Sequence, residues 1–450
     1  MSDNIIRSLE QLDHISSILD RGTLGQVRLT ISSLAPFDIA YLLESSPPKH
    51  RHVLWRLIEG PLQGEVLNEL PDELSSTFLK EMDPQEVALI TAGLDDDDVA
   101  DILHRLPESV TSEVLRAMDQ QHRTRLEAVM FYPDDTAGGL MNTDAITIRA
   151  DITLEVVLRF LRRREIIPEM TDNLIVVTRN DSYIGLLPLK TILVSEPNCS
   201  VREMMITDRG SIPVEMKDDD VARLFERNHW ISAPVIDKNN IFLGRITIDD
   251  VVDVIRDDAD HSLMSMAGLD EYEDTFSPIK GTAPRRAIWL GINLFTALIA
   301  SSMINIFQET IEKVVALAVL MPIVASMGGI AGTQTLTVLI RGMAMGTVSK
   351  NNQGWLISRE ATIGVINGVL WALAISIIAS VWFADWMIGL IIAIAVFINL
   401  LTAGIAGAIL PVLLRNFRID PALAGGVILT TITDVVGFVS FLGLATIFYA

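Results

Sequence analysis

PALAGGVILTTITDVVGFVSFLGLATIFYA, residues 421–450, is a hydrophobic stretch with one charged residue, Asp434, near its middle. Crossing a bilayer takes about 20 apolar residues, so this stretch predicts a transmembrane helix. An ionisable side chain near the membrane centre costs about 3 kcal/mol or more, and it therefore usually faces a polar cavity or a partner. Asp434 is the first candidate functional residue. The alternative is an acid that only holds helices together through a polar or basic neighbour.

The charges of the chain divide it into two unlike parts. Of the 57 acidic and 35 basic side chains, only six acids and eight bases lie beyond residue 280. The first 280 residues therefore carry a net charge of −24 and the remainder +2. An acidic surface repels nucleic acid and attracts cations, but on charge count alone simple solubility is the better explanation. The single Cys199 excludes a disulfide framework and a thiolate metal cluster.

Four further apolar stretches precede the last one. We predict five spans, at about residues 287–307, 315–340, 361–383, 386–414 and 421–449. Basic residues gather in the loops near residues 285–286, 341–359 and 415–418. The chain begins without a basic segment followed by an apolar run, so we expect no signal peptide. The positive-inside rule then predicts a multi-pass protein of the cell (inner) membrane, with a cytoplasmic N-terminus and the C-terminus outside.

Two of the spans carry residues that suit an ion path. Pro322 and the glycines of the second span predict a helix that is broken or closely packed. The hydroxyl and carboxylate oxygens of the fifth span are hard donors, which suit Mg²⁺ or Ca²⁺. One acid per chain is too few for a closed cage, but a dimer axis could bring two copies of Asp434 together. The candidate pore residues are Asp434, Thr430, Thr431, Gly328, Gly329 and Ala331.

Residues 1–130 show a 12-residue period. Each period ends in an apolar residue, which is usually followed by Pro, Asp or Glu. These three residue types are typical of the first turn of a helix. We therefore predict an array of short stacked helices, with an ordinary helical bundle as the alternative. The residues on this period are Leu34, Ile58, Leu70, Met82, Leu94, Leu106 and Met118.

Residues 131–254 contain two similar β-rich copies, at about 138–199 and 200–254. Each copy has a β-rich run, a turn, a second run and then a helix, with Gly185 and Gly244 at equivalent places. The pair resembles a tandem CBS module. In CBS modules a Thr followed three residues later by Asp often holds a nucleotide ribose, and Thr247 with Asp250 matches that short pattern.

A helix is predicted from Asp249, and it continues into an acidic connecting helix at residues 255–284. Asp249, Asp253, Asp257 and Asp260 are spaced by four, four and three residues, so they share one helical face. Like charges at this spacing destabilise a helix, so the face needs cations, basic partners or simple hydration. A second dense cluster spans residues 95–98. The candidate cation-sensing residues are Asp95, Asp98, Asp249, Asp250, Asp253, Asp257, Asp258 and Asp260.

Three motifs lie at widely separated places in the chain: Ala-Gly-Gly-Leu-Met at 137–141, Pro322 with Gly328-Gly329, and Asp-Pro-Ala at 420–422 with Asp434. With these motifs, the chain resembles the MgtE-type magnesium transporter and channel family over its whole length. Two positions differ from the family pattern. Ile330 stands where Gly-Gly is usually followed by Asn, and Val427 stands where a Pro usually precedes the acid by seven residues.

The resemblance implies a multi-domain membrane protein. Its expected parts are an α-helical superhelical N-domain, a tandem α/β CBS module, an acidic connecting helix and a five-helix transmembrane domain. The resemblance further implies a homodimer in a lipid membrane, in which Asp434 lines the pore and selects the ion. It also implies that cytoplasmic acids bind Mg²⁺ and that ATP can bind in the CBS region.

The sequence predicts passive uptake of a divalent cation, most simply Mg²⁺, gated by intracellular Mg²⁺. One alternative is a divalent transporter with altered selectivity, for example for Co²⁺ or Mn²⁺. Another is a membrane-anchored regulator that senses a nucleotide or an ion. We expect no enzyme, because the sequence contains no HExxH motif, no phosphate-binding GxxxxGK[ST] loop and no convincing Ser-His-Asp or Cys-His arrangement. We also expect no nucleic-acid partner.

Overall fold

The computed structural model describes residues 24–164, 166–208, 210–269, 276, 279–349 and 351–449. The first 23 residues of the predicted N-domain and part of the predicted connecting segment lie outside these ranges. The chain forms two compact units. Unit 1 comprises residues 1–259 and 272–278, and unit 2 comprises residues 260–271 and 279–450.

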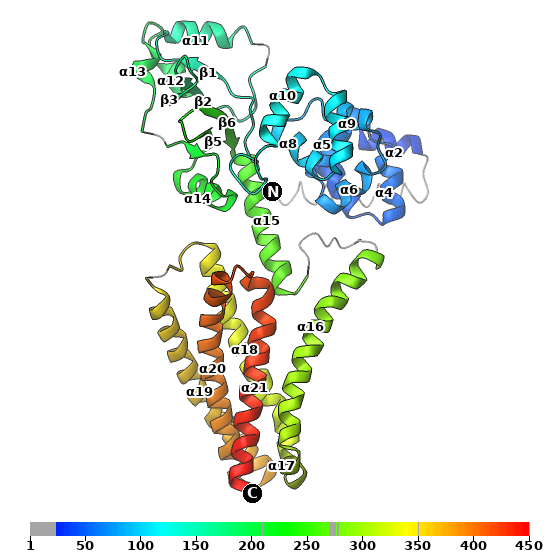
Figure 1. The fold of residues 1–450 in the computed structure, drawn as a ribbon, viewed down its shortest axis with the longest axis vertical. Helices are drawn as coiled ribbons and strands as arrows, with labels where there is room; N and C mark the ends of the chain where they lie inside the picture. Colours follow the sequence, from blue (N-terminus) through cyan, green and yellow to red (C-terminus); the bar gives the residue numbers. More distant parts are fainter. Residues whose placement is uncertain are drawn as a thin grey trace. The chain divides into compact units, whose positions relative to one another are not determined.

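The first part of unit 1 is an array of short helices that start every 12 residues. Several begin with a proline, and others carry acids in the first turn, where the helix dipole favours negative charge. The apolar residues of the 12-residue period are buried or pack against one continuous core. The predicted helical array is therefore confirmed. Its members are α2 (Leu24–Ile31), α3 (Pro36–Glu44), α4 (Pro48–Trp55), α5 (Gly60–Glu69), α6 (Asp72–Leu79), α7 (Pro84–Ile90), α8 (Asp96–His104), α9 (Glu108–Ala117) and α10 (Gln120–Val129) (Figure 1).

The second part of unit 1 contains two three-stranded sheets of the same topology. In each sheet the first strand pairs parallel with the second, and the second pairs antiparallel with the third. One sheet contains β1 (Thr147–Arg149), β2 (Asn173–Val177) and β3 (Tyr183–Pro188), and the other contains β4 (Ile212–Pro213), β5 (Ser232–Ile236) and β6 (Phe242–Thr247). The helices of this part are α11 (Leu154–Leu161), α12 (Leu189–Val194), α13 (Val201–Met204) and α14 (Asp218–Asn228).

The two equivalent glycines let a neighbouring segment cross each sheet closely. A Cβ atom on Gly185 would lie 2.5 Å from the Ile206 carbonyl oxygen, and one on Gly244 would lie 2.7 Å from the Asn142 carbonyl oxygen. A side chain at either position would therefore displace the crossing backbone. The repeated sheet and the repeated glycine are consistent with a tandem CBS module.

The acidic helix α15 (Ile248–Met266) begins where a helix from Asp249 was predicted, but it ends well before the predicted connecting helix at 255–284 does. Its start is fixed by Asp250, whose carboxylate accepts a hydrogen bond from the Thr247 backbone N–H at 3.2 Å. Its end is followed by Gly268, whose φ of +70° is incompatible with a continuing helix. Residues 279–284 belong instead to the first membrane helix.

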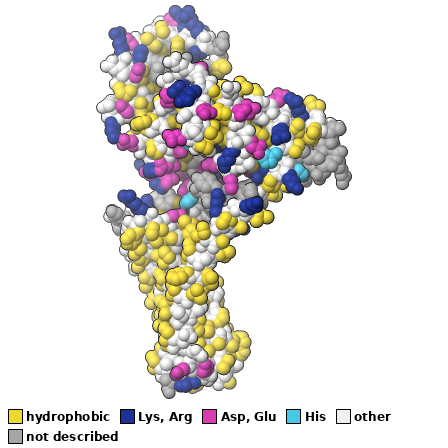
Figure 2. All heavy atoms as spheres, turned by 45° about the vertical axis from the view of Figure 1, so that its right-hand side comes forward, with side chains coloured by type: hydrophobic (Ala, Val, Ile, Leu, Met, Phe, Trp, Pro, Cys, Tyr) yellow, Lys and Arg dark blue, Asp and Glu magenta, His cyan; other side chains and the backbone are white. Residues whose placement is uncertain are grey.

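Unit 2 contains five helices that are long and apolar enough to cross a membrane. They are α16 (Ile279–Ile306), α18 (Ala316–Ala344), α19 (Gln353–Phe383), α20 (Trp386–Asn416) and α21 (Pro421–Tyr449), with the short α17 (Gln308–Lys313) between the first two. In unit 2, α20 packs against α18, α19 and α21 (Figure 1). Hydrophobic side chains dominate the face of these helices seen in Figure 2.

The second span is a continuous helix that contains Pro322, so a break in this span was a wrong expectation. The alternative expectation, close packing, is correct. A Cβ atom on Gly407 of α20 would lie 2.9 Å from the Gly332 carbonyl oxygen of α18. Small residues let these two backbones approach within the membrane.

Candidate functional site

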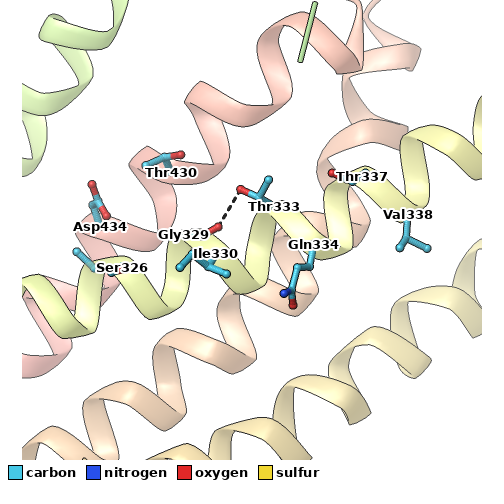
Figure 3. Close-up of a pocket in the computed structure, with 10 residues that line it drawn as sticks. Ser326, Gly329, Ile330, Thr333, Gln334, Thr337, Val338, Thr430 and Asp434 are labelled. Atoms are coloured by element: carbon cyan, nitrogen blue, oxygen red, sulfur yellow. Dashed lines mark hydrogen bonds between the residues drawn. The ribbon is translucent and has the colours of Figure 1, made fainter. Parts of the chain in front are cut away.

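A cavity of about 780 Å³ lies along α18 and α21 in unit 2. Asp434 and Thr430 come from α21, and the other lining residues come from α18 (Figure 3). Several of the lining side chains are polar or charged. The full lining is Ala325, Ser326, Gly329, Ile330, Thr333, Gln334, Thr337, Val338, Thr430 and Asp434.

The helical period explains why these residues share one face. On α18, the lining positions 326, 330, 333 and 337 are spaced by four, three and four residues, and on α21 the positions 430 and 434 are four apart. Ser326, Thr333 and Thr337 are exposed on the surface of the single chain. Polar groups at membrane depth are tolerated where they meet water or another protein surface. This face therefore needs either water or a partner against it.

The cavity presents oxygen atoms to a ligand. The Thr333 hydroxyl donates its proton to the Gly329 carbonyl at 2.9 Å, and the Thr430 hydroxyl donates to the Gly426 carbonyl at 2.8 Å. Each hydroxyl oxygen thereby keeps its lone pairs for a cation. Together with the Asp434 carboxylate, the lining offers hard oxygen donors of the kind that Mg²⁺ and Ca²⁺ prefer.

The six predicted pore residues are not all on this cavity. Asp434, Thr430 and Gly329 line it, whereas Gly328, Ala331 and Thr431 do not. Gly328 is buried against Asn399 of α20, and Ala331 packs at the edge of the apolar membrane core. The Thr431 hydroxyl donates to the Val427 carbonyl at 2.8 Å.

Sequence reasoning missed the polar residues of α18 that line the cavity. Ser326, Thr333 and Thr337 carry a usable signal, because they recur at helical spacing within an apolar span. Ile330 lies on the same face and is 58% exposed, so an apolar group stands beside the cavity where the sequence resemblance leads one to expect Asn.

A second candidate site lies in unit 1, where the acidic start of α8 meets the start of α15. The Asp95–Asp98 run separates into different surroundings, because successive side chains on a helix turn by about 100°. Asp96 is buried and accepts a hydrogen bond from the Thr143 hydroxyl. The Asp96 carboxylate also lies 3.5 Å from His122 Nε2 and 3.5 Å from Arg125 Nε. Asp96 is therefore a structural acid with its own partners.

The remaining acids of this run face α15. The pKa of Asp97 is raised well above its ordinary value, first by burial and then by the charge of Asp250. Asp98 accepts a hydrogen bond from Asn68 Nδ2 at 2.9 Å, yet burial and the charge of Asp95 raise its pKa to about 7. On α15, burial and then Asp249 raise the pKa of Asp250 to about 8.

These raised pKa values show that the packed arrangement is unfavourable when the acids are charged. A proton or a bound cation would relieve it, and a divalent cation would relieve two charges at once. The carboxylate oxygens of the cluster are therefore a chemical setting that suits a hard cation. The α8–α15 carboxylate cluster comprises Asp95, Asp97, Asp98, Asp249 and Asp250.

The other predicted sensor residues lie further along α15. Burial raises the pKa of Asp253, although Arg256, whose Nη2 lies 3.0 Å from the carboxylate, acts against this shift. Asp257, Asp258 and Asp260 are exposed. Asp97 was missed in the sequence, because nothing in a run of four acids indicates which of them becomes buried.

The predicted ribose-binding pair, Thr247 and Asp250, is close together but already engaged. The Thr247 hydroxyl donates to Asp250 Oδ2 at 2.9 Å and contacts Asp249. Asp250 therefore belongs to the α8–α15 carboxylate cluster, and Thr247 donates hydrogen bonds to two of its members at the start of α15. Their role toward a nucleotide stays a prediction.

Comparison with known proteins identifies matches along most of the chain. The family model for the MgtE intracellular N domain matches residues 34–135, and the CBS domain model matches residues 137–196 and 201–257. The model described as a divalent cation transporter, MgtE, matches residues 321–444.

Two curated relatives and one solved structure extend these matches. The magnesium transporter MgtE of Bacillus subtilis (strain 168) is 31% identical over 441 residues, which cover 98% of this chain and 97% of the relative. The magnesium transporter MgtE of Thermus thermophilus is 28% identical over 437 residues, which cover 96% and 97%. A crystal structure of the cytosolic domain of the Mg²⁺ channel MgtE in complex with ATP is 29% identical with a TM-score of 0.50, covering 54% of this chain and 99% of that one.

Proposed function

The chain belongs to the MgtE family of magnesium transporters, and from this premise we propose that it conducts Mg²⁺ along the cavity between α18 and α21. The single observation that carries the proposal is the position of Asp434. It is the one charged residue of α21, and it lines a cavity together with the hydroxyls of two helices. As a transporter the protein is not an enzyme, and it is a multi-pass membrane protein.

The size and chemistry of the cavity suit a hydrated ion. Mg²⁺ loses its water reluctantly and keeps an octahedral shell of ligands. Six waters occupy about 180 Å³ at their share of liquid volume, which is well below the cavity volume of about 780 Å³. Asp434 would attract the ion through this shell, and the oxygen atoms of Thr333 and Thr430 would accept hydrogen bonds from its waters.

The polar face also supports a homodimer. A single chain would expose Ser326, Thr333 and Thr337 to lipid, which is unfavourable at membrane depth. A second copy facing the first would cover both faces and bring two Asp434 carboxylates to one path. We place the N-terminal unit in the cytoplasm and the C-terminus outside, because the basic loops all lie on one side of the predicted topology.

Transport in this scheme is passive. The membrane potential supplies about 2.3 kcal/mol per charge for each 100 mV, and about twice that for a divalent ion. The proposed regulator is the α8–α15 carboxylate cluster. Cytoplasmic Mg²⁺ bound there would offset the repulsion and favour the packed form of unit 1, and its loss would favour separation.

ATP binding in the CBS region is a further part of the proposal. It is supported by the likeness to the cytosolic domain of an Mg²⁺ channel in complex with ATP. Equilibrium dialysis of the purified protein with labelled ATP tests it. Saturable binding is expected, and unsaturable uptake of label would argue against a site.

Growth rescue tests the transport proposal in cells. The chain should restore growth at low Mg²⁺ to a strain that lacks its own Mg²⁺ uptake, and Asp434→Asn should not. Glu312→Gln is a matched control, because Glu312 is an exposed acid of the same unit outside the cavity lining. Equal rescue by Asp434→Asn, with equal amounts of protein in the membrane, would count against the ion path.

A broader cation selectivity is a second candidate, favoured by the exposed Ile330 beside the cavity. An apolar group cannot accept or donate hydrogen bonds to the waters of a hydrated ion. Uptake of Mg²⁺, Ca²⁺, Mn²⁺ and Co²⁺ should therefore be compared for the natural chain and Ile330→Asn. A shift of Ile330→Asn toward Mg²⁺ would support this candidate, and identical ion rankings would contradict it.

A further inference from the structure

A group of potential metal ligands that includes an imidazole lies further along α8 than its acidic start. Its member Asp101 is close enough to Asp98 and to Asp253 of α15 for their charges to interact. Asp101 and His104 are three residues apart and therefore neighbours on the helix surface. Asp134 reaches them from the segment after α10 that leads into the CBS module. One ligand atom from each of the three residues lies within 4.8 Å of the others, and His104 Nδ1 is 2.6 Å from Asp134 Oδ1.

The donor set differs in kind from the two sites described above. It combines an imidazole nitrogen with two carboxylates, whereas the cavity and the α8–α15 carboxylate cluster offer oxygen. Mg²⁺ prefers oxygen ligands, but imidazole suits Zn²⁺, Co²⁺ and Ni²⁺. We propose that Asp101, His104 and Asp134 form a site for a transition-metal dication of the Zn²⁺ class, which joins the helical array to the CBS module.

The side chains must move to hold such an ion. Ligand atoms about 2.1 Å from a tetrahedral Zn²⁺ lie about 3.4 Å apart. His104 Nδ1 and Asp134 Oδ1, now 2.6 Å apart, must therefore separate by about 0.8 Å, and the most distant atoms, within 4.8 Å, must approach by up to about 1.4 Å. Side-chain rotation can supply this, because the His104 and Asp134 side chains are 29% and 60% exposed. The exposure also leaves room for water as a fourth ligand, as in open zinc sites.

Charges of both signs surround the group. Arg105, which directly follows α8, acts on Asp101, and its Nε lies 2.7 Å from Asp72 Oδ1. The carboxylates of Asp72 and Asp253 act on Asp101 in the opposite direction. A simple ion pair between His104 and Asp134 is the competing explanation for their contact. That pair does not require Asp101, yet an Asp101 carboxylate oxygen lies within 4.8 Å of both ligand atoms of the pair.

Calorimetric titration of the full-length protein in detergent tests the proposal. The chelator-treated protein is titrated with Zn²⁺ in the presence of excess Mg²⁺. We expect the natural chain to bind one more Zn²⁺ than His104→Gln, and Asp134→Asn to weaken that binding at least about tenfold. His52→Gln is the matched control, since His52 Nδ1 lies 3.6 Å from a single carboxylate, that of Glu81. It should bind like the natural chain.

Three outcomes would overturn the site. They are equal Zn²⁺ stoichiometry and affinity in His104→Gln, displacement of the extra Zn²⁺ by Mg²⁺, or an equal loss in His52→Gln. Co²⁺ absorption of the natural chain provides an independent test if a variant folds poorly. A spectrum of bound Co²⁺ with a nitrogen ligand is expected, and its absence would also overturn the site. Binding in detergent does not require transport, so failure here leaves the proposed ion path unaffected.

Discussion

Replacing Gly328 by alanine should destabilise unit 2, whereas the same replacement of Gly329 should not. A Cβ atom at 328 would lie 2.2 Å from Asn399 Nδ2 and 2.7 Å from Asn399 Cγ, and at 329 it would meet no described atom within 4 Å. Asn399 is fully buried, and its Nδ2 donates to the Val324 carbonyl at 2.8 Å. The added methyl group must therefore displace this amide.

The magnitude follows from two contributions. Overpacking a well-packed core costs about 1–3 kcal/mol, and loss of the amide hydrogen bond costs about 1 kcal/mol more. Both variants gain the same intrinsic helix propensity of alanine over glycine, about 1 kcal/mol, so it cancels in the comparison. Gly328→Ala should accordingly be about 2–4 kcal/mol less stable than Gly329→Ala.

Unfolding of the two purified variants in the same detergent measures this difference directly. Denaturant titrations followed by tryptophan fluorescence would report the membrane unit, because several tryptophans lie in its helices. Equal midpoints for Gly328→Ala and Gly329→Ala would refute the assignment of one glycine to packing and its neighbour to the cavity. A lower midpoint for Gly329→Ala would refute it more strongly.

Three further predictions concern the acidic groups. Because the pKa values of Asp98 and Asp250 are raised to about 7 and about 8 from 3.8, folded unit 1 holds protons that the unfolded chain releases. The melting temperature of unit 1, measured in the presence of a chelator, should therefore fall as the pH rises from about 4 to 8, and added Mg²⁺ should reduce this fall. A melting temperature that does not change with pH in the presence of the chelator would contradict this prediction. Asp250→Asn removes one charge from the α8–α15 carboxylate cluster. It should therefore slow proteolysis of unit 1 in the presence of a chelator and reduce the further protection from proteolysis that Mg²⁺ gives. Equal protection by Mg²⁺ in the variant and the natural chain would count against the cluster. Glu360→Ala should destabilise the membrane unit by about 1–3 kcal/mol in denaturant titrations. The Glu360 carboxylate accepts hydrogen bonds from Arg359 Nη1 at 2.5 Å and from the buried Thr335 hydroxyl at 3.1 Å, and the variant loses both. Unchanged stability would show that these contacts are not stabilising.

The membrane spans were largely predictable because hydropathy is a local property of the chain. The predicted and observed bounds agree closely at 386 and 421, where the apolar residues begin with the helix. They disagree for α16 and α19, which begin at Ile279 and Gln353 instead of 287 and 361. The first two turns of both helices contain polar and basic residues, so a span predicted from apolar residues alone begins later in the sequence than the helix does.

The helical array was predictable for a similar reason. Its 12-residue period repeats the same apolar position and the same helix-start signals, and each repeat needs only its neighbours for burial. Asp434 could be named as a candidate because an isolated charge in an apolar stretch is unfavourable unless it meets a polar neighbour or water, whatever the packing of the helix. These features depend on nearby sequence alone.

The distribution of residues around a helix was not predictable. Gly328 and Gly329 are adjacent in sequence, yet one packs against Asn399 and the other lines the cavity. Asp96 and Asp97 are equally acidic, yet only Asp96 has basic partners within 4 Å among the described residues. In each case the surroundings of the residue depend on which distant part of the chain packs against that side of the helix. A single sequence, read for local patterns, does not show which part that is.

Mg²⁺ uptake into liposomes is the most direct test of the central claim that ions pass Asp434. The purified natural chain, Asp434→Asn and Glu312→Gln are reconstituted in equal amounts, with a Mg²⁺-sensitive dye inside and a negative internal potential. The natural chain and Glu312→Gln should take up Mg²⁺ at similar rates, and Asp434→Asn should fall to the rate of empty liposomes. Uptake by Asp434→Asn at the natural rate would contradict the account.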